Sequence, residues 1–258
     1  MSDDKTPKPF NLNMHTARLL MNEPFFAALS RRIEKTRSTS IPTAGVRVNP
    51  ATAQFELMYN PEFMGALSDK HQLGVLKHEF YHIIFEHVTG RKPPGGLKRL
   101  DNIAMDLAIN SHIANELPNE ADPGPIVGTN EPMKACIPGE GPFAKYPPNQ
   151  TYEWYKARLE EDQEASKGGE GGDGEPGDPF GDADSFDSHD DFGESEGTAS
   201  DIAKERLRDA VKKAAEEAEK ARNWGTMTSD MRKQILDSIT TKIDWRKVLR
   251  YFVKTSQR

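Results

Sequence analysis

The chain has 258 residues, enough to bury a sizeable core as one domain, or as one domain with a smaller helical piece. Hydrophobic residues make up only 35% of it, which indicates that part of the chain is not packed into a core. A single cysteine, Cys136, excludes an internal disulfide framework and fits a reducing compartment. The amino-terminal segment lacks the layout of a signal peptide, and no apolar run approaches the roughly eighteen residues of a membrane span. We therefore expect a soluble, cytoplasmic protein without a membrane partner.

The net charge of −7 belongs to one segment of the chain. Residues 167–200 hold eleven acidic side chains against one lysine, so the rest of the chain is slightly basic. Neither part has the strong clustering of basic residues that nucleic-acid binding requires. We expect no nucleic-acid partner.

The first expected elements are a helix and a β-hairpin. Residues 15–36 are typical of a helix interrupted near Pro24. Its expected core residues are Phe25, Phe26 and Leu29. Two short strand-like runs follow, residues 45–48 and 54–60, separated by a turn-like segment at residues 49–53. The sequence therefore predicts a small β-sheet after the first helix.

A strongly apolar helix is expected next. Ser68 or Asp69 can cap its first turn, with Gln72 placed three residues after Asp69 as in a capping box. The helix is predicted to run to about Thr89, with Gly90 as the residue that follows its end.

The remaining chain alternates helices with irregular segments. The expected elements are a helix over residues 101–117, an ordered loop over 118–149, a short helix over 151–161, and C-terminal helices over 200–221, 230–239 and 245–253. Between the helices over residues 151–161 and 200–221, the acidic segment holds nine glycines and too little apolar surface to offset the entropy of ordering it, so we expect a disordered linker. The predicted division is a domain over residues 1–162, a linker over 163–199 and a helical segment over 200–258.

The apolar helix carries a metal-binding pattern. Residues 78–82, HEFYH, fit H-E-x-x-H, in which helical residues four apart lie about 40° apart around the axis and can reach one ion. Glu79 can then reach a water molecule at the metal and act as a general base. The alternative is an ordinary surface helix, but the apolar flanks indicate burial, and buried ionisable groups need partners. We therefore expect His78 and His82 to bind a zinc ion.

A third histidine, His87, lies nine residues after His78. If the helix continues, nine residues turn it by about 180°, so His87 faces away from the metal. We expect His87 to be a partly buried structural histidine near the helix end, where the helix dipole favours a cation.

The third ligand is sought on the next helix. Asn102, Asp106 and Asn110 fall at positions i, i+4 and i+8 and form one polar stripe on an otherwise apolar helix. Such a stripe can simply face solvent. Asparagine is a weak helix former, however, so the stripe is better explained by Asp106 as a carboxylate ligand with the two amides as supporting donors or loop anchors. His112 points away from the stripe and is expected to be structural.

Residues 60–91 and 100–110 resemble the metallopeptidase domain of bacteria and phages that commonly precedes a von Willebrand factor A-like domain. Weaker similarity covers most of the chain outside the linker. The resemblance implies a zincin-like α+β fold, mostly helical, in which a small sheet lies against the active-site helix and a second helix carries the third ligand. The sequence ends about where the A-like domain would begin, so we expect a fragment or a stand-alone version, with a von Willebrand A-like domain or another protein as a partner.

Two further roles in such a site have candidates. Residues 54–60 can pair with an extended substrate, although an ordinary core strand explains them equally well. Tyr152, Tyr155 and His189 can stabilise an oxyanion, but nothing in the sequence ranks them. His71 can line the mouth of a cleft or simply lie in the first turn of its helix.

These residues predict a zinc-dependent metallopeptidase that acts on a peptide or protein substrate, with His78, His82 and Asp106 as ligands and Glu79 as the base. One alternative is a non-catalytic zinc-binding structural or adaptor module, which needs a fourth protein ligand such as His189 or Cys136. The other is a phage or bacterial assembly component with a vestigial metal site.

Overall fold

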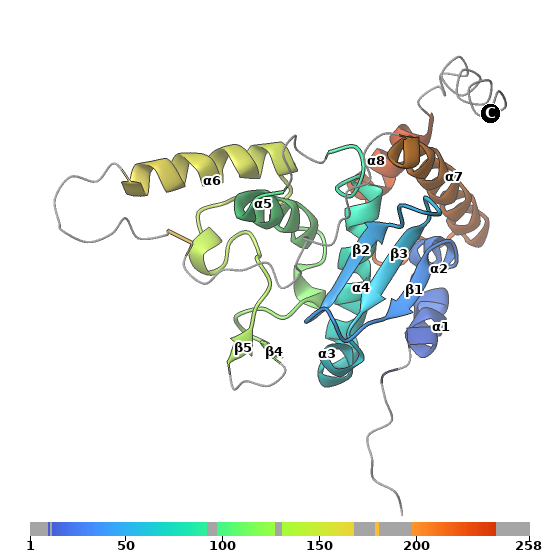
Figure 1. Cartoon of the computed structure of the whole chain (residues 1–258), viewed down its shortest axis with the longest axis horizontal. Coiled ribbons are helices and arrows are strands. Elements are labelled where there is room, and N and C mark those ends of the chain that lie inside the picture. Colours follow the sequence, from blue (N-terminus) through green and yellow to red (C-terminus); the bar gives the residue numbers. More distant parts are fainter. Residues whose placement is uncertain are drawn as a thin grey trace, which may run out of the picture.

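The computed structural model describes residues 10, 12–91, 97–126, 131–167, 179–180 and 198–240 (Figure 1). Its amino-terminal half contains α1 (Leu12–Asn22), α2 (Pro24–Ser30), β1 (Glu34–Arg37), β2 (Ala44–Val48), β3 (Phe55–Tyr59), α3 (Pro61–Ala66), α4 (Asp69–Ile84) and α5 (Arg99–Asn110). The rest contains η1 (Ala114–Glu116), β4 (Gly124–Pro125), β5 (Pro132–Met133), η2 (Gly141–Phe143), α6 (Tyr152–Lys167), α7 (Thr198–Ala221) and α8 (Ser229–Thr240). The fold is therefore mixed α+β, mostly helical with a small sheet, as the sequence predicts.

The main sheet has three strands in the order β1-β3-β2. The predicted hairpin is confirmed, because β2 and β3 pair antiparallel with Val48 opposite Phe55. The third strand corrects the sequence analysis: residues 34–36 were predicted to be helical but lie in β1, which pairs parallel with β3. The sequence of β1, EKTR, has no apolar alternation, so its strand conformation follows from backbone pairing with β3 rather than from a hydrophobic pattern.

One core joins the sheet to helices from both ends of the chain. In the view of Figure 1, α4 lies behind the sheet, where it contacts β2 and α2, and α5 runs beside it. Helix α2 carries the predicted core residues Phe25, Phe26 and Leu29, all fully buried. Helix α7 packs along α2, and α8 packs on α7. The C-terminal helices thus cover the same core as the sheet and α4.

The start of α4 agrees with one of the two predicted caps, whereas the capping box and the end of the helix differ from the prediction. Ser68 is the N-cap, and its side chain accepts a hydrogen bond from the backbone N–H of His71. Gln72 is not part of a capping box, because its amide donates to the carbonyls of Met64 and Leu67. The helix ends at Ile84 rather than near residue 89.

Other boundaries also shift. Helix α5 ends at Asn110 and is followed by a turn and η1, whereas the prediction extended it to residue 117. Helix α6 continues to Lys167, beyond its predicted end at residue 161. Phe180, within the acidic segment, is buried and stacks on Phe143 with ring centroids 6.0 Å apart. Residues 168–178 and 181–197, including His189, and the predicted helix over residues 245–253 lie outside the described residues.

No helix in the described part of the chain combines the length and apolar character needed to cross a membrane.

Candidate metal centre

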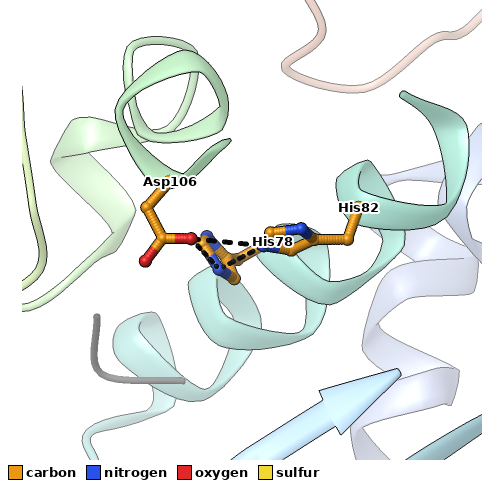
Figure 2. A group of neighbouring side chains, drawn as sticks. All are labelled: His78, His82 and Asp106. Atoms are coloured by element: carbon orange, nitrogen blue, oxygen red, sulfur yellow. Dashed lines mark hydrogen bonds and ion pairs between the residues drawn. The ribbon is translucent and has the colours of Figure 1, made fainter. Parts of the chain in front are cut away.

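Three side chains that the sequence predicts as ligands meet between α4 and α5. Figure 2 shows His78 and His82 projecting from α4 toward Asp106 on α5. The two Nε2 atoms are 3.0 Å apart, and Oδ1 of Asp106 lies 3.5 Å from Nε2 of His78 and 3.3 Å from Nε2 of His82. All three side chains are fully buried. The i, i+4 spacing on α4 and the polar stripe on α5 thus converge on one point.

The distances within this group fit a zinc ion. Zinc binds imidazole nitrogen and carboxylate oxygen at about 2.0–2.2 Å in tetrahedral geometry, which places neighbouring donor atoms about 3.3 Å apart. The three observed separations, 3.0, 3.3 and 3.5 Å, surround that value. Two imidazoles and one carboxylate also match the three-ligand sets that leave a fourth position open for substrate or water.

The histidines are in the neutral form that binds metal. Burial lowers the pKa of His78 to about 4, although the nearby Asp106 carboxylate acts in the opposite direction. Burial also lowers the pKa of His82 to about 3. Both imidazoles are therefore neutral near pH 7, with one nitrogen carrying a lone pair.

Asn110 determines which nitrogen of His78 has the lone pair. Its Nδ2 donates to the backbone carbonyl of Cys136 at 2.8 Å, which leaves Oδ1 to accept a hydrogen bond from Nδ1 of His78, also at 2.8 Å. The hydrogen of His78 is thus on Nδ1, and Nε2 faces the centre with its lone pair. The predicted supporting role of Asn110 agrees with this geometry. Asn102, two turns earlier, is only partly buried.

Glu79 is fully buried next to His78 but is not part of the ligand group. Within the described residues, the side chains whose donor atoms all lie within 4.8 Å of one another are His78, His82 and Asp106. Cys136, one predicted fourth ligand, also lies outside this group. Glu79 thus follows His78 on α4, with a buried side chain that does not belong to the ligand group.

His87 was expected to face away from the metal if the helix continued, but the helix ends at Ile84, and His87 contacts His82 while staying outside the ligand group. After α4 ends, Glu86 adopts a left-handed conformation with φ of 60°. The N–H of His87 then donates to the carbonyl of His82, and that of Glu86 donates to the carbonyl of Ile83, each at 3.0 Å, as in a Schellman motif. This turn brings Nδ1 of His87 to 3.1 Å from Nδ1 of His82, and the His87 side chain is fully buried. The predicted orientation of His87 assumed a helix that continues to about Thr89, whereas the chain turns back after Ile84.

The hydroxyls of the two tyrosines that are candidates for oxyanion stabilisation have hydrogen-bond partners in the fold. The hydroxyl of Tyr152 donates to the Asp101 carboxylate at 2.8 Å, and that of Tyr155 donates to the carbonyl of Pro147 at 2.8 Å. Residues 54–60 do not offer a substrate edge either, because β3 is paired with β1 on one side and with β2 on the other. The edge strand in contact with α4 is β2, with which only β3 pairs among the described strands.

Two other histidines lie away from the centre. His112 is a structural histidine, as predicted: its ring centroid lies 6.1 Å from the rings of Tyr81 and Phe85, and burial lowers its pKa. His71 is buried in the first turn of α4, where Nε2 lies 3.3 Å from the Asp122 carboxylate.

The comparisons with known proteins give one match. A family model described as "Putative metallopeptidase domain" matches residues 8–258. The comparison with curated proteins gives no match, and neither does the comparison with solved structures. The matched residues include both helices of the centre.

Proposed function

We propose that this chain, which belongs to the family described as "Putative metallopeptidase domain", hydrolyses peptide bonds with a zinc ion held by His78, His82 and Asp106. One observation carries the proposal: two imidazole nitrogens and a carboxylate oxygen converge at 3.0–3.5 Å in a buried site, as a tetrahedral zinc ion requires. The arrangement of a small sheet, α4 against it and α5 carrying the carboxylate supports a zincin-like fold.

The zinc ion, when bound, lowers the pKa of a coordinated water to about 7 and polarises the substrate carbonyl. Glu79, adjacent to His78 and outside the ligand group, is the base that removes a proton from the attacking water. The same carboxyl group then donates this proton to the leaving amine. Asn110 holds the imidazole of His78 through Nδ1, so that Nε2 faces the site. The Asp106 carboxylate offsets the positive charge of the ion.

A peptide is the substrate class that the neighbouring sheet favours. Strand β2 packs against α4 and uses one edge for pairing with β3. An extended peptide can add to the other edge through backbone hydrogen bonds, which are independent of side-chain identity. Peptide or protein substrates are therefore the proposed targets, and a von Willebrand A-like domain or another protein is the proposed partner. The proposed location is the cytoplasm.

The alternative is a non-catalytic zinc-binding structural or adaptor module. It is favoured by the complete burial of the three ligand side chains, since a catalytic ion needs access for substrate. The two functions differ in one respect that can be measured: only the peptidase depends on a proton carrier at position 79.

The test uses Glu79→Gln, which keeps the size of the side chain but removes its basicity. We expect the variant to bind one zinc ion per chain, as the wild type does, and to cleave an unstructured protein substrate at least about 100-fold more slowly. The matched control is Glu62→Gln, the same chemical change at an exposed residue of α3, which should cleave at the wild-type rate. Zinc content is measured by mass spectrometry of metals, and cleavage by the appearance of new amino termini. Cleavage by Glu79→Gln at the wild-type rate would show that the proposed mechanism is wrong, and zinc binding without cleavage by the wild type would favour the structural module.

A further inference from the structure

We propose that His87 is a positioning residue that sets the tautomer and orientation of His82 for the metal. The inference rests on the metal site of the proposed function and adds a residue to it. The key observation is the 3.1 Å separation between Nδ1 of His87 and Nδ1 of His82, both on fully buried side chains.

A hydrogen bond between two neutral imidazoles needs one donor and one acceptor nitrogen. If His82 donates from Nδ1, its Nε2 has a lone pair directed at His78 and Asp106, where the ion would lie. If His87 donates instead, Nδ1 of His82 is the acceptor, and the hydrogen of His82 must be on Nε2. With a hydrogen on Nε2, this nitrogen has no free lone pair to bind the metal. Metal binding is therefore compatible with only one assignment, in which Nδ1 of His87 is the acceptor and His87 carries its own hydrogen on Nε2.

The two metal-facing imidazoles thus donate their Nδ1 hydrogens to different acceptors. His78 is held by the amide oxygen of Asn110 and His82 by the ring nitrogen of His87. Metal-binding histidines usually donate their second N–H to a carboxylate, a carbonyl or water. Here a third histidine takes that place.

The backbone after α4 is built to bring His87 to this position. In a continuous helix, the five residues from His82 to His87 would turn the side chain by about 140°, away from its partner. The left-handed residue Glu86 ends the helix, and the hydrogen bond from the His87 N–H to the His82 carbonyl fixes the return of the chain. The His87 ring is further enclosed by Phe85 and Tyr152, with ring centroids 5.7 and 6.0 Å away.

Three substitutions at position 87 separate the hydrogen bond from packing. In His87→Asn, the side-chain oxygen can occupy the position of Nδ1 and keep an acceptor there. In His87→Gln, the amide is of similar polarity but lies one bond further out, near the position of Nε2. His87→Leu removes the acceptor and keeps an apolar side chain.

The first readout is the zinc dissociation constant, measured by competition with a chromophoric chelator at pH 7.5. We expect His87→Gln and His87→Leu to bind zinc about 10–100-fold more weakly than the wild type, as for loss of a partner of a metal ligand. His87→Asn should remain within about threefold of the wild type. Thermal unfolding of the metal-free variants is the folding control, and the Asn–Gln pair decides the question if the Leu variant does not fold.

The second readout is the ¹⁵N spectrum of the imidazole of His82 in the metal-free protein, where no ion imposes the tautomer. A single Nδ1–H form is expected in the wild type and in His87→Asn. Equal zinc affinity in all variants would overturn the inference, and so would equal loss in His87→Asn and His87→Gln. Zinc binding is measured without cleavage, so a protein that binds zinc but does not hydrolyse peptides would refute the peptidase and leave this test valid. A wild-type protein that binds no zinc would overturn both.

Discussion

Acidification should destabilise the metal-free protein through its two buried metal-site histidines. Burial lowers the pKa of His78 to about 4 and that of His82 to about 3, whereas both have a pKa near 6.5 in the unfolded chain. Between these values the unfolded chain binds protons that the folded protein does not. Stability therefore falls as the pH decreases below about 6.5, and it stops falling from this cause below the folded-state pKa values.

The magnitude follows from the shifts. One proton of difference changes the free energy of unfolding by about 1.4 kcal/mol per pH unit. Between pH 6 and pH 5 both histidines are mostly protonated in the unfolded chain, so together they should lower the free energy of unfolding by about 2 to 3 kcal/mol. That is a large part of the about 5–15 kcal/mol that stabilises a typical domain.

The assay is urea unfolding followed by circular dichroism at pH 7, 6 and 5 with a chelator present. The comparison variant is His82→Gln, in which one titrating group is absent, so its loss of stability per pH unit should be smaller than that of the wild type by about 1.4 kcal/mol. His15, His71 and His112, three of the histidines outside the centre, are unchanged in the variant, so their contributions should cancel in the comparison. The same pH dependence in the wild type and the variant would refute the argument that His82 is buried and neutral.

Three further predictions concern stability and use the same unfolding assay at pH 7. Lys77→Met should lower the free energy of unfolding by about 3–5 kcal/mol. Nζ of this buried lysine lies 3.2 Å from the Glu23 carboxylate and 2.7 Å from the Glu116 carboxylate, and the substitution leaves both negative charges without their cation. An unchanged free energy of unfolding would contradict this. Glu86→Gly should gain about 1 kcal/mol, because glycine adopts a φ of 60° without strain; a loss would show that the glutamate side chain stabilises the turn. Ser68→Ala should lose about 1 kcal/mol with the N-cap of α4, whereas Ser68→Asp should not.

The part of the site that depends on helical spacing could be predicted from the sequence. His78 and His82 lie four residues apart, and Asp106 lies in a polar stripe on the next apolar helix, so their shared faces follow from the period of the helix alone. The β2–β3 hairpin could be predicted for a similar reason, because its strands have a local β pattern and a turn between them.

The features of the fold and the site that depend on tertiary pairing and on helix termination could not be predicted from the sequence. His87 returns to His82 only because Glu86 adopts a left-handed conformation. A glutamate in the sequence does not signal such a conformation, and Gly90 wrongly suggested that the helix ends later. Strand β1 was missed because its conformation comes from pairing with β3, which is about twenty residues away in sequence.

The most direct test of the central claim is a crystal structure of the zinc-loaded protein, with the anomalous signal of zinc used to locate the ion. We predict one ion within about 2.0–2.2 Å of Nε2 of His78, Nε2 of His82 and a carboxylate oxygen of Asp106, with the fourth position occupied by a non-protein ligand. An ion without Asp106 among its ligands would contradict the site, and a fourth ligand from the protein would contradict the peptidase.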